Sequence, residues 1–327
     1  MKNVRRILIR KILSAFITLL LVIIINFALF RMMPGDPLKF MVPSDPKIPE
    51  EYLEKLIDKY NLDAPLPEQF ITYIKGVFTL DFGDSFYYKD TPAMEHVLEY
   101  MTWTLVLVGI ASVFMIVIGM LIGIVAAWKR GGPFDTGSLA FSLFFYAMPT
   151  FWLAMMMVML FSKTWDLFPS ARALEIGETF HFTLDSIMDL LDHLVLPVAT
   201  LVLVYIATFS LLMRGALSDV MTDDYITTAR AKGLSEMSVL KDHAVPNAML
   251  PMLALIALTI AYIVAGAFMV EYVFEYPGVG WATIDAVMRE DWPVLQAAFF
   301  LIAVAVIIAN FAADVMMLYM DPRVELE

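Results

Sequence analysis

The chain has 327 residues, of which 60% are hydrophobic and only 17% are charged. Soluble domains use apolar residues for about half of their sequence and charged residues for about a quarter, so this composition excludes an ordinary soluble domain. It indicates an integral protein of the lipid bilayer. The formal net charge of −12 argues against a nucleic acid partner, because phosphate binding needs clustered Lys and Arg. The absence of Cys excludes disulfides and thiolate metal sites.

Six apolar stretches are long enough to cross a bilayer as helices, which takes about 20 residues each. We therefore predict an all-α integral membrane protein with six transmembrane helices. The spans are expected at Ile12–Phe30, Thr102–Trp128, Gly137–Phe161, Leu194–Met213, Met252–Val270 and Val294–Leu318.

The N-terminus carries five basic residues and no acidic residue ahead of the first apolar stretch. That stretch is longer than the core of a secretory signal and no small-residue cleavage site follows it, so we predict an uncleaved first span. The positive-inside rule places the basic end in the cytoplasm. Both termini are then cytoplasmic, together with residues 129–136 and 214–250. The acid-rich connections 31–101, 162–193 and 271–293 are expected outside.

The first connection is too long for a simple loop. Helical spacing of apolar residues over Pro49–Tyr60 and about Glu68–Phe78 predicts a small external helical subdomain. We expect three parts: the N-terminus with the first span (1–31), the external subdomain (32–101) and a five-span core (102–327).

Groups that could carry catalysis are missing from the spans. The chain has no phosphate-binding loop and no zinc-protease or serine-hydrolase motif. Asp314 is either a functional intramembrane charge or the partner of a nearby Lys or Arg, and we favour the ion pair. Gly119 and Gly123 allow close helix approach, either inside the chain or at a subunit contact. Pro149 and Pro197 are expected to kink their helices, with gating hinges as the alternative.

The fourth connection, residues 214–250, predicts two short helices joined at a glycine. Thr222 or Asp223 can cap the first helix, and Gly233 stands where a left-handed residue ends it. Ser235 can cap the second helix, which we expect to end before Pro246.

In order and spacing this connection resembles the EAA loop of ABC-importer permeases, E-A-A-x3-G-x9-I-x-L-P. Three residues match the motif, namely Ala229, Gly233 and Pro246. Four positions depart from it, with Thr227 and Thr228 in place of Glu-Ala, and His243 and Val245 in place of Ile and Leu.

The chain also resembles, nearly end to end, the peptide-type permeases of dipeptide, oligopeptide and nickel importers. Pro-Gly-Asp-Pro after the first span is similar to that of their B-type subunit. The segments that carry the likeness are 31–37, 81–86, 149–152, 224–233, 271–280 and 321–323.

The resemblance implies a type I ABC-importer permease in a prokaryotic plasma membrane. Such a subunit lines one pathway together with a homologous C-type permease. Two cytoplasmic ATPases dock beneath the pair, and an external substrate-binding protein delivers the solute. ATP and Mg belong to the ATPases, so this chain is expected to be no enzyme and to hold no cofactor. Peptides are the expected cargo, with oligosaccharides, nickel or glutathione as alternatives. A non-transporting membrane scaffold or receptor is the alternative from another class.

The resemblance also assigns site residues. Residues 214–250 become the ATPase-coupling loop, in which small residues would lie in a groove of the ATPase and basic ones would reach its acidic rim. The coupling residues are Tyr225, Thr228, Ala229, Arg230, Ala231, Lys232, Gly233, Leu234, Ser235 and Pro246. Contacts with the binding protein are expected at Asp84, Glu271 and Glu275. No catalytic, metal or pathway residue is assigned.

Overall fold

The computed structural model of the protein describes residues 2–31, 64–88, 90–263 and 267–320. Within these ranges the chain is helical apart from its connections and one isolated bridge between Asp84 and Pro92. The elements are α1 (Lys2–Arg31), α4 (Leu66–Thr79), α5 (Ala93–Trp128), α6 (Pro133–Tyr146), α7 (Thr150–Met157), the π-helix η1 (Val158–Thr164), α8 (Leu184–Val220), α9 (Asp224–Ala231), α10 (Glu236–Ser238), the π-helix η2 (Val239–Ala244), α11 (Val245–Ile263), α12 (Phe268–Val273), α13 (Val279–Met288) and α14 (Trp292–Met320).

Four helices are long and apolar enough to cross a membrane, which confirms the helical membrane class. They cover Leu8–Leu29, Ala93–Trp128, Leu184–Val220 and Trp292–Val315. α6 and α7–η1 qualify together as a fifth span, although they are bent by 98° relative to each other. α11 begins before the predicted fifth span, and the count of six stays a prediction.

The third span, predicted at Gly137–Phe161 with a kink at Pro149, is sharply bent at that proline, which confirms the kink. α6 ends at Tyr146 and α7 begins at Thr150, with Pro149 in an extended conformation between them. Proline lacks an N–H and its ring disfavours a helical conformation of the residue before it, so the hydrogen-bond ladder breaks here. Pro197, by contrast, lies inside the unbroken α8.

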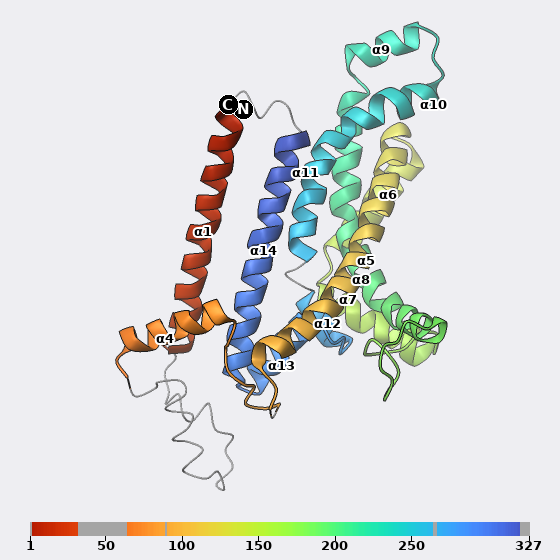
Figure 1. Ribbon diagram of the computed structural model, residues 1–327. Helices are drawn as coiled ribbons and strands as arrows, with labels where there is room; N and C mark the ends of the chain where they lie inside the picture. Colours follow the sequence, from red (N-terminus) through yellow and green to blue (C-terminus); the bar gives the residue numbers. More distant parts are fainter. Residues whose placement is uncertain (1, 32–63, 89, 264–266, 321–327) are drawn as a thin grey trace.

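The two ends of the bundle carry different elements (Figure 1). The start of α1, the end of α14 and the pair α9–α10 lie at one end, whereas α4, α12 and α13 lie at the other. The parts predicted to share the cytoplasmic side therefore share one end of the molecule. The predicted helix Pro49–Tyr60 and the segments 32–37 and 321–323 lie outside the described residues.

α5 and α8 form the central pair, and two glycines set their close approach. A Cβ added to Gly119 would lie 2.7 Å from the Cβ of Phe209, and one added to Gly123 would lie 2.7 Å from the Cβ of Met213. Real Cβ atoms do not come so close, so a side chain at either position would push the helices apart. Packing inside the chain, the interpretation we favoured for these glycines, is confirmed.

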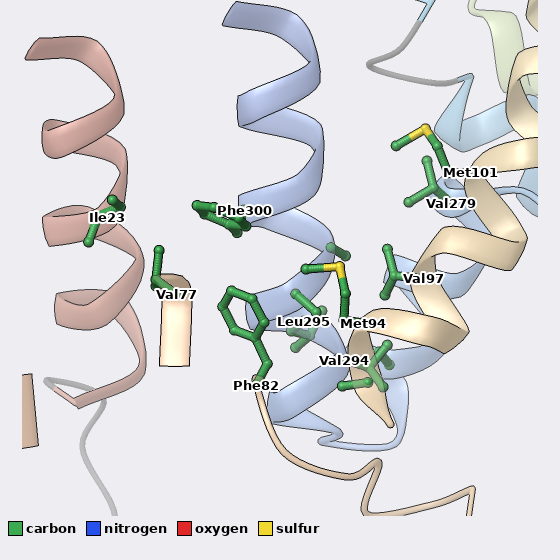
Figure 2. Close-up of a cluster of buried hydrophobic side chains, with 14 residues drawn as sticks. Ile23, Val77, Phe82, Met94, Val97, Met101, Val279, Val294, Leu295 and Phe300 are labelled. Atoms are coloured by element: carbon green, nitrogen blue, oxygen red, sulfur yellow. The ribbon is translucent and has the colours of Figure 1, made fainter. Parts of the chain in front are cut away.

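A buried apolar cluster at the end opposite α9–α10 joins five helices (Figure 2). Its members come from α1, α4, α5, α13 and α14, with Phe82 from the loop between α4 and α5. The labelled side chains are Ile23, Val77, Phe82, Met94, Val97, Met101, Val279, Val294, Leu295 and Phe300. The described part of the first connection is thus packed onto the bundle.

Two ion pairs join helices across the bundle. Lys11 Nζ lies 2.7 Å from Asp314 Oδ2, which ties α1 to α14 and confirms the ion-pair interpretation of Asp314. The guanidinium of Arg214 in α8 donates twice to the buried carboxylate of Asp135 in α6, with an Nη2–Oδ2 distance of 2.9 Å. The backbone N–H of Gly131 donates to the same carboxylate at 2.9 Å. The turn before α6 is therefore fixed to the end of α8.

Replacement of this buried carboxylate should destabilise the protein. Asp135→Asn removes the charge that faces the partly exposed Arg214 and should lower the free energy of unfolding by about 1.5–2 kcal/mol. Glu236→Gln is the matched control, because the Arg230–Glu236 pair is exposed and such pairs contribute about 0–1 kcal/mol. Thermal unfolding in detergent measures both changes. Equal losses for the two variants would contradict the role given to the Asp135–Arg214 pair.

Candidate functional site

The fourth connection forms two helical segments joined at a glycine, as predicted. α9 ends at Ala231, and Gly233 follows with a φ of +80°, in the left-handed region that favours glycine. Its N–H donates to the carbonyl of Arg230 at 2.9 Å. Ser235 begins the next segment and accepts a hydrogen bond from the N–H of Ser238 at 3.2 Å. The predicted glycine elbow and the serine cap are confirmed.

The inner face of α9 packs on the chain's own helices. Ile226 is fully buried and Ala229 is buried beside it. Both belong to an apolar cluster with Met213 and Leu217 of α8 and Val239 of η2. The expectation that Ala229 lies in a groove of a partner is therefore wrong, because its side chain is already covered by this chain. α9 is fixed to the end of α8 and moves with it.

The outer face of the loop is exposed. Arg230 forms a two-point ion pair with Glu236, at 3.0 Å from Nε to Oε1 and 3.2 Å from Nη2 to Oε2, so it joins α9 to α10. The expected coupling residues on this face are Tyr225, Thr228, Arg230, Ala231, Lys232, Gly233, Leu234 and Ser235. The side chains of Tyr225, Leu234 and Met237 are exposed as well.

The prediction that the second helix ends before Pro246 is wrong. α10, η2 and α11 follow one another without a break, and Pro246 is the second residue of α11. Proline inside a helix clashes with the carbonyl four residues earlier and cannot donate to it. The turn before Pro246 has the wider π-helical hydrogen bonding of η2, which accommodates the ring. The loop is thus continuous with α11.

A cavity of about 570 Å³ lies beside the middle of the long helices. The polar side-chain groups that line it are hydroxyls, and none of the described lining residues carries a charge at neutral pH. The lining residues are Val108, Ala111, Ser112, Met115, Thr150, Leu201, Tyr205, Thr208, Phe209, Leu255, Leu258, Thr259, Ala267, Phe268, Met269 and Val270. They come from α5, α7, α8, α11 and α12, so the α5–α8 pair that carries the loop also lines the cavity.

Glu271, predicted to contact a binding protein, is fully buried instead. Its carboxylate accepts hydrogen bonds from the Thr104 hydroxyl at 3.0 Å and the Gly280 N–H at 2.7 Å, with longer ones from Ala267 and Trp281. A Cβ on Gly280 would lie 2.7 Å from Oε2. The prediction is wrong because Thr104 of α5 and the start of α13 enclose the side chain.

Asp84 and Glu275, the other two predicted external residues, are exposed. The loop next to Asp84 is held by Asp291, whose carboxylate accepts hydrogen bonds from the Ser85 hydroxyl and the N–H of Phe86. Tyr88 donates to Asp285 at 3.0 Å. Burial, reinforced by this hydrogen bond to the Asp285 carboxylate, raises the pKa of Tyr88, so its phenol remains a donor. This surface is therefore rigidly built.

Sequence reasoning missed the cavity residues. Tyr205 and Thr208 are three apart on α8, and Ser112 is a hydroxyl inside an apolar helix. Polar residues on one face of a predicted span are a signal that could have found them.

Comparisons with known proteins place the whole chain in one group. Residues 119–326 match the family model of the binding-protein-dependent transport system inner membrane component, and residues 4–119 match the model of its N-terminal part. The di/tripeptide transport system permease DppB of Pseudomonas aeruginosa is 34% identical, over 93% of this chain and 94% of that protein. The oligopeptide transport system permease AppB of Bacillus subtilis is 32% identical, over 97% and 98%.

A solved structure supports the fold. A chain of the MetNI methionine ABC transporter in inward-facing conformations aligns with a TM-score of 0.56. The alignment covers 70% of this chain and 97% of that one at 16% identity. This likeness concerns the fold alone.

Replacement of the buried Glu271 should lower the stability of the protein. Glu271→Gln turns an amide N–H toward donors that now face a carboxylate, and should cost about 1–3 kcal/mol of stability. Glu275→Gln makes the same chemical change on an exposed side chain and should stay within about 0.5 kcal/mol. Melting temperatures of the two purified variants give the comparison. A Glu271→Gln protein as stable as the wild type would show that these hydrogen bonds contribute little.

Proposed function

The chain belongs to the family of inner membrane components of binding-protein-dependent transport systems, and we propose that it forms half of the translocation pathway of a peptide importer. It is a permease subunit of an ABC transporter and not an enzyme. The observation that carries the proposal is the placement of two features on one helix pair. α5 and α8 line the cavity in their middle and hold the helix–Gly–helix loop at one end.

The partners follow from what this chain contains. It has no phosphate-binding loop, so ATP and Mg act in two separate ATPase subunits that dock beneath the pair of permeases, one of them on the exposed face of residues 214–250. A homologous C-type permease supplies the other half of the pathway. An external substrate-binding protein delivers the cargo at the opposite end, where Asp84 and Glu275 are exposed. These two carboxylates are proposed contacts.

Coupling works by rigid movement of the loop. The Arg230–Glu236 pair joins α9 to α10, Ile226 joins α9 to α8, and η2 runs into α11. Movement of a docked ATPase is therefore passed to α8 and α11 together. Both helices line the cavity, so ATPase closure changes access to it.

The arrangement in the membrane completes the proposal. α11 serves as the fifth span and the bent α6–α7 pair as the third, which gives six spans. The chain then consists of the N-terminus with the first span (1–31), the external subdomain (32–101) and the five-span core (102–327). The basic N-terminus lies in the cytoplasm, and the C-terminus and the coupling loop lie on the same side.

Peptides are the proposed cargo because the similar permeases are named for dipeptide, tripeptide and oligopeptide transport. A transport assay distinguishes peptide import from the alternatives. These are import of oligosaccharides, nickel or glutathione by the same machinery, and a scaffold or receptor that transports nothing. The assay uses the complete importer in proteoliposomes, with ATP inside and the peptide-loaded binding protein outside. ATP-dependent uptake of a labelled tripeptide supports the proposal, and absence of tripeptide uptake would refute it, whether or not another of these solutes is taken up.

Gly233→Val should uncouple the importer in this assay. The left-handed conformation costs a non-Gly residue about 1 kcal/mol or more, and β-branching adds to it. No atom lies within 4 Å of the added Cβ, so the effect is conformational and changes the angle between α9 and α10. Membrane insertion should be normal, whereas peptide-stimulated ATP hydrolysis and uptake should fall together. Gly137→Val is the control, since its added Cβ also meets no atom and lies in helix α6. Wild-type coupling in Gly233→Val would rule out the proposed role of the elbow.

Single cysteines in this Cys-free chain test the orientation. Arg130→Cys lies in the exposed turn before α6, and Glu178→Cys lies in the exposed loop before α8. In right-side-out vesicles an impermeant thiol reagent should label Glu178→Cys at once and Arg130→Cys only after permeabilisation. The reverse pattern would invert the proposed topology, and immediate labelling of both would exclude it.

A further inference from the structure

Resting on the proposed function, we infer that the cavity is a subsite for one uncharged residue of the transported peptide. The apolar side chain of that residue packs on the walls from α5, α8 and α11. The hydroxyls of Ser112 and Thr208 bond to its peptide group. The volume of about 570 Å³ lies in the range of small-molecule sites.

Ser112 is the first observation behind this assignment. Its side chain is 3% exposed, and its hydroxyl has no hydrogen-bond partner among the residues that the structure describes. A serine inside a helix ordinarily bonds to the carbonyl one turn earlier. An unsatisfied buried hydroxyl costs about 1–3 kcal/mol, which a bound polar group would recover. Ser112 is one of the residues that line the cavity.

The composition of the cavity walls indicates which kind of peptide residue the subsite would take. Among the described lining residues the polar groups are hydroxyls, from Ser112, Thr150, Tyr205, Thr208 and Thr259, and the other side chains are apolar. A Lys or Asp side chain of a peptide would lie against these walls without an opposite charge, which is unfavourable. A sugar ring would leave many hydroxyls against Leu, Val, Met and Phe. A neutral, apolar residue fits both the walls and the few hydroxyls.

The lining also places the subsite where cargo must pass. Met115 of α5 and Phe209 of α8 line it near Gly119, at the close contact of the two helices. Leu255, Leu258 and Thr259 of α11 continue the helix that starts from the coupling loop. Movement passed from the coupling loop would reach these wall residues and change the fit of the bound residue.

A charge placed in the cavity tests the inference. Thr208→Asp adds a carboxylate to the wall, and Thr208→Asn adds a neutral side chain of the same shape. In the proteoliposome assay, with the same binding protein, we compare uptake of Leu-containing and Lys-containing tripeptides. Thr208→Asp should raise the Lys/Leu uptake ratio about tenfold, whereas Thr208→Asn should leave it within about twofold of the wild type. Thr179→Asp, in an exposed loop, is the control for added charge and should not change the ratio.

Ser112→Ala gives a second readout that does not depend on tolerance of a buried charge. The variant removes an unpartnered hydroxyl, so its melting temperature should equal or exceed that of the wild type. Its uptake of the Leu peptide should nevertheless fall about fivefold, the worth of one hydrogen bond. The subsite would be overturned if Thr208→Asp kept the wild-type Lys/Leu uptake ratio, or if Ser112→Ala took up the Leu peptide like the wild type. In either case peptide import by the wild type would leave the proposed function standing. Absence of peptide uptake by the wild type would overturn both.

Discussion

The close contact of α5 and α8 at Gly119 and Gly123 is the constraint on which the other features depend. The same two helices carry different structures along their length. Their middle parts enclose the cavity, while their ends support Ile226 of α9 and the Asp135–Arg214 pair. A transport subunit needs a pathway that can change shape and helices that keep their packing while it does so. The glycines at this contact let the two helix backbones approach closely, and a side chain at either position would push them apart.

Features determined by local chemistry were predictable from the sequence. Gly233 and Ser235 act through their own backbone and side chain, and the pattern of apolar residues identified the long helices. Features determined by the rest of the fold were not. Glu271 follows an apolar stretch in a predicted external connection, and only the approach of Thr104 and α13 encloses it. Ala229 matched a family motif, yet its partner surface turned out to be α8 and η2.

The local structure around a proline could not be predicted from the residue type alone. Pro149 interrupts a predicted span with a sharp bend, Pro197 is accommodated inside α8, and Pro246 is preceded by the π-helical turn η2. The residue type is the same in all three cases, so the outcome depends on how neighbouring turns satisfy the freed carbonyl groups. The sequence marks the three positions but does not distinguish them. The cavity was hidden for a related reason, since its lining is assembled from five separate helices.

The uncharged lining of the cavity has an electrical consequence. A charge that crosses a membrane exchanges about 2.3 kcal/mol with every 100 mV of potential. Because the described walls contribute no ionised group, any charge moved through this half of the pathway is the cargo's own. A zwitterionic peptide carries none in sum, so its passage neither draws on the membrane potential nor opposes it.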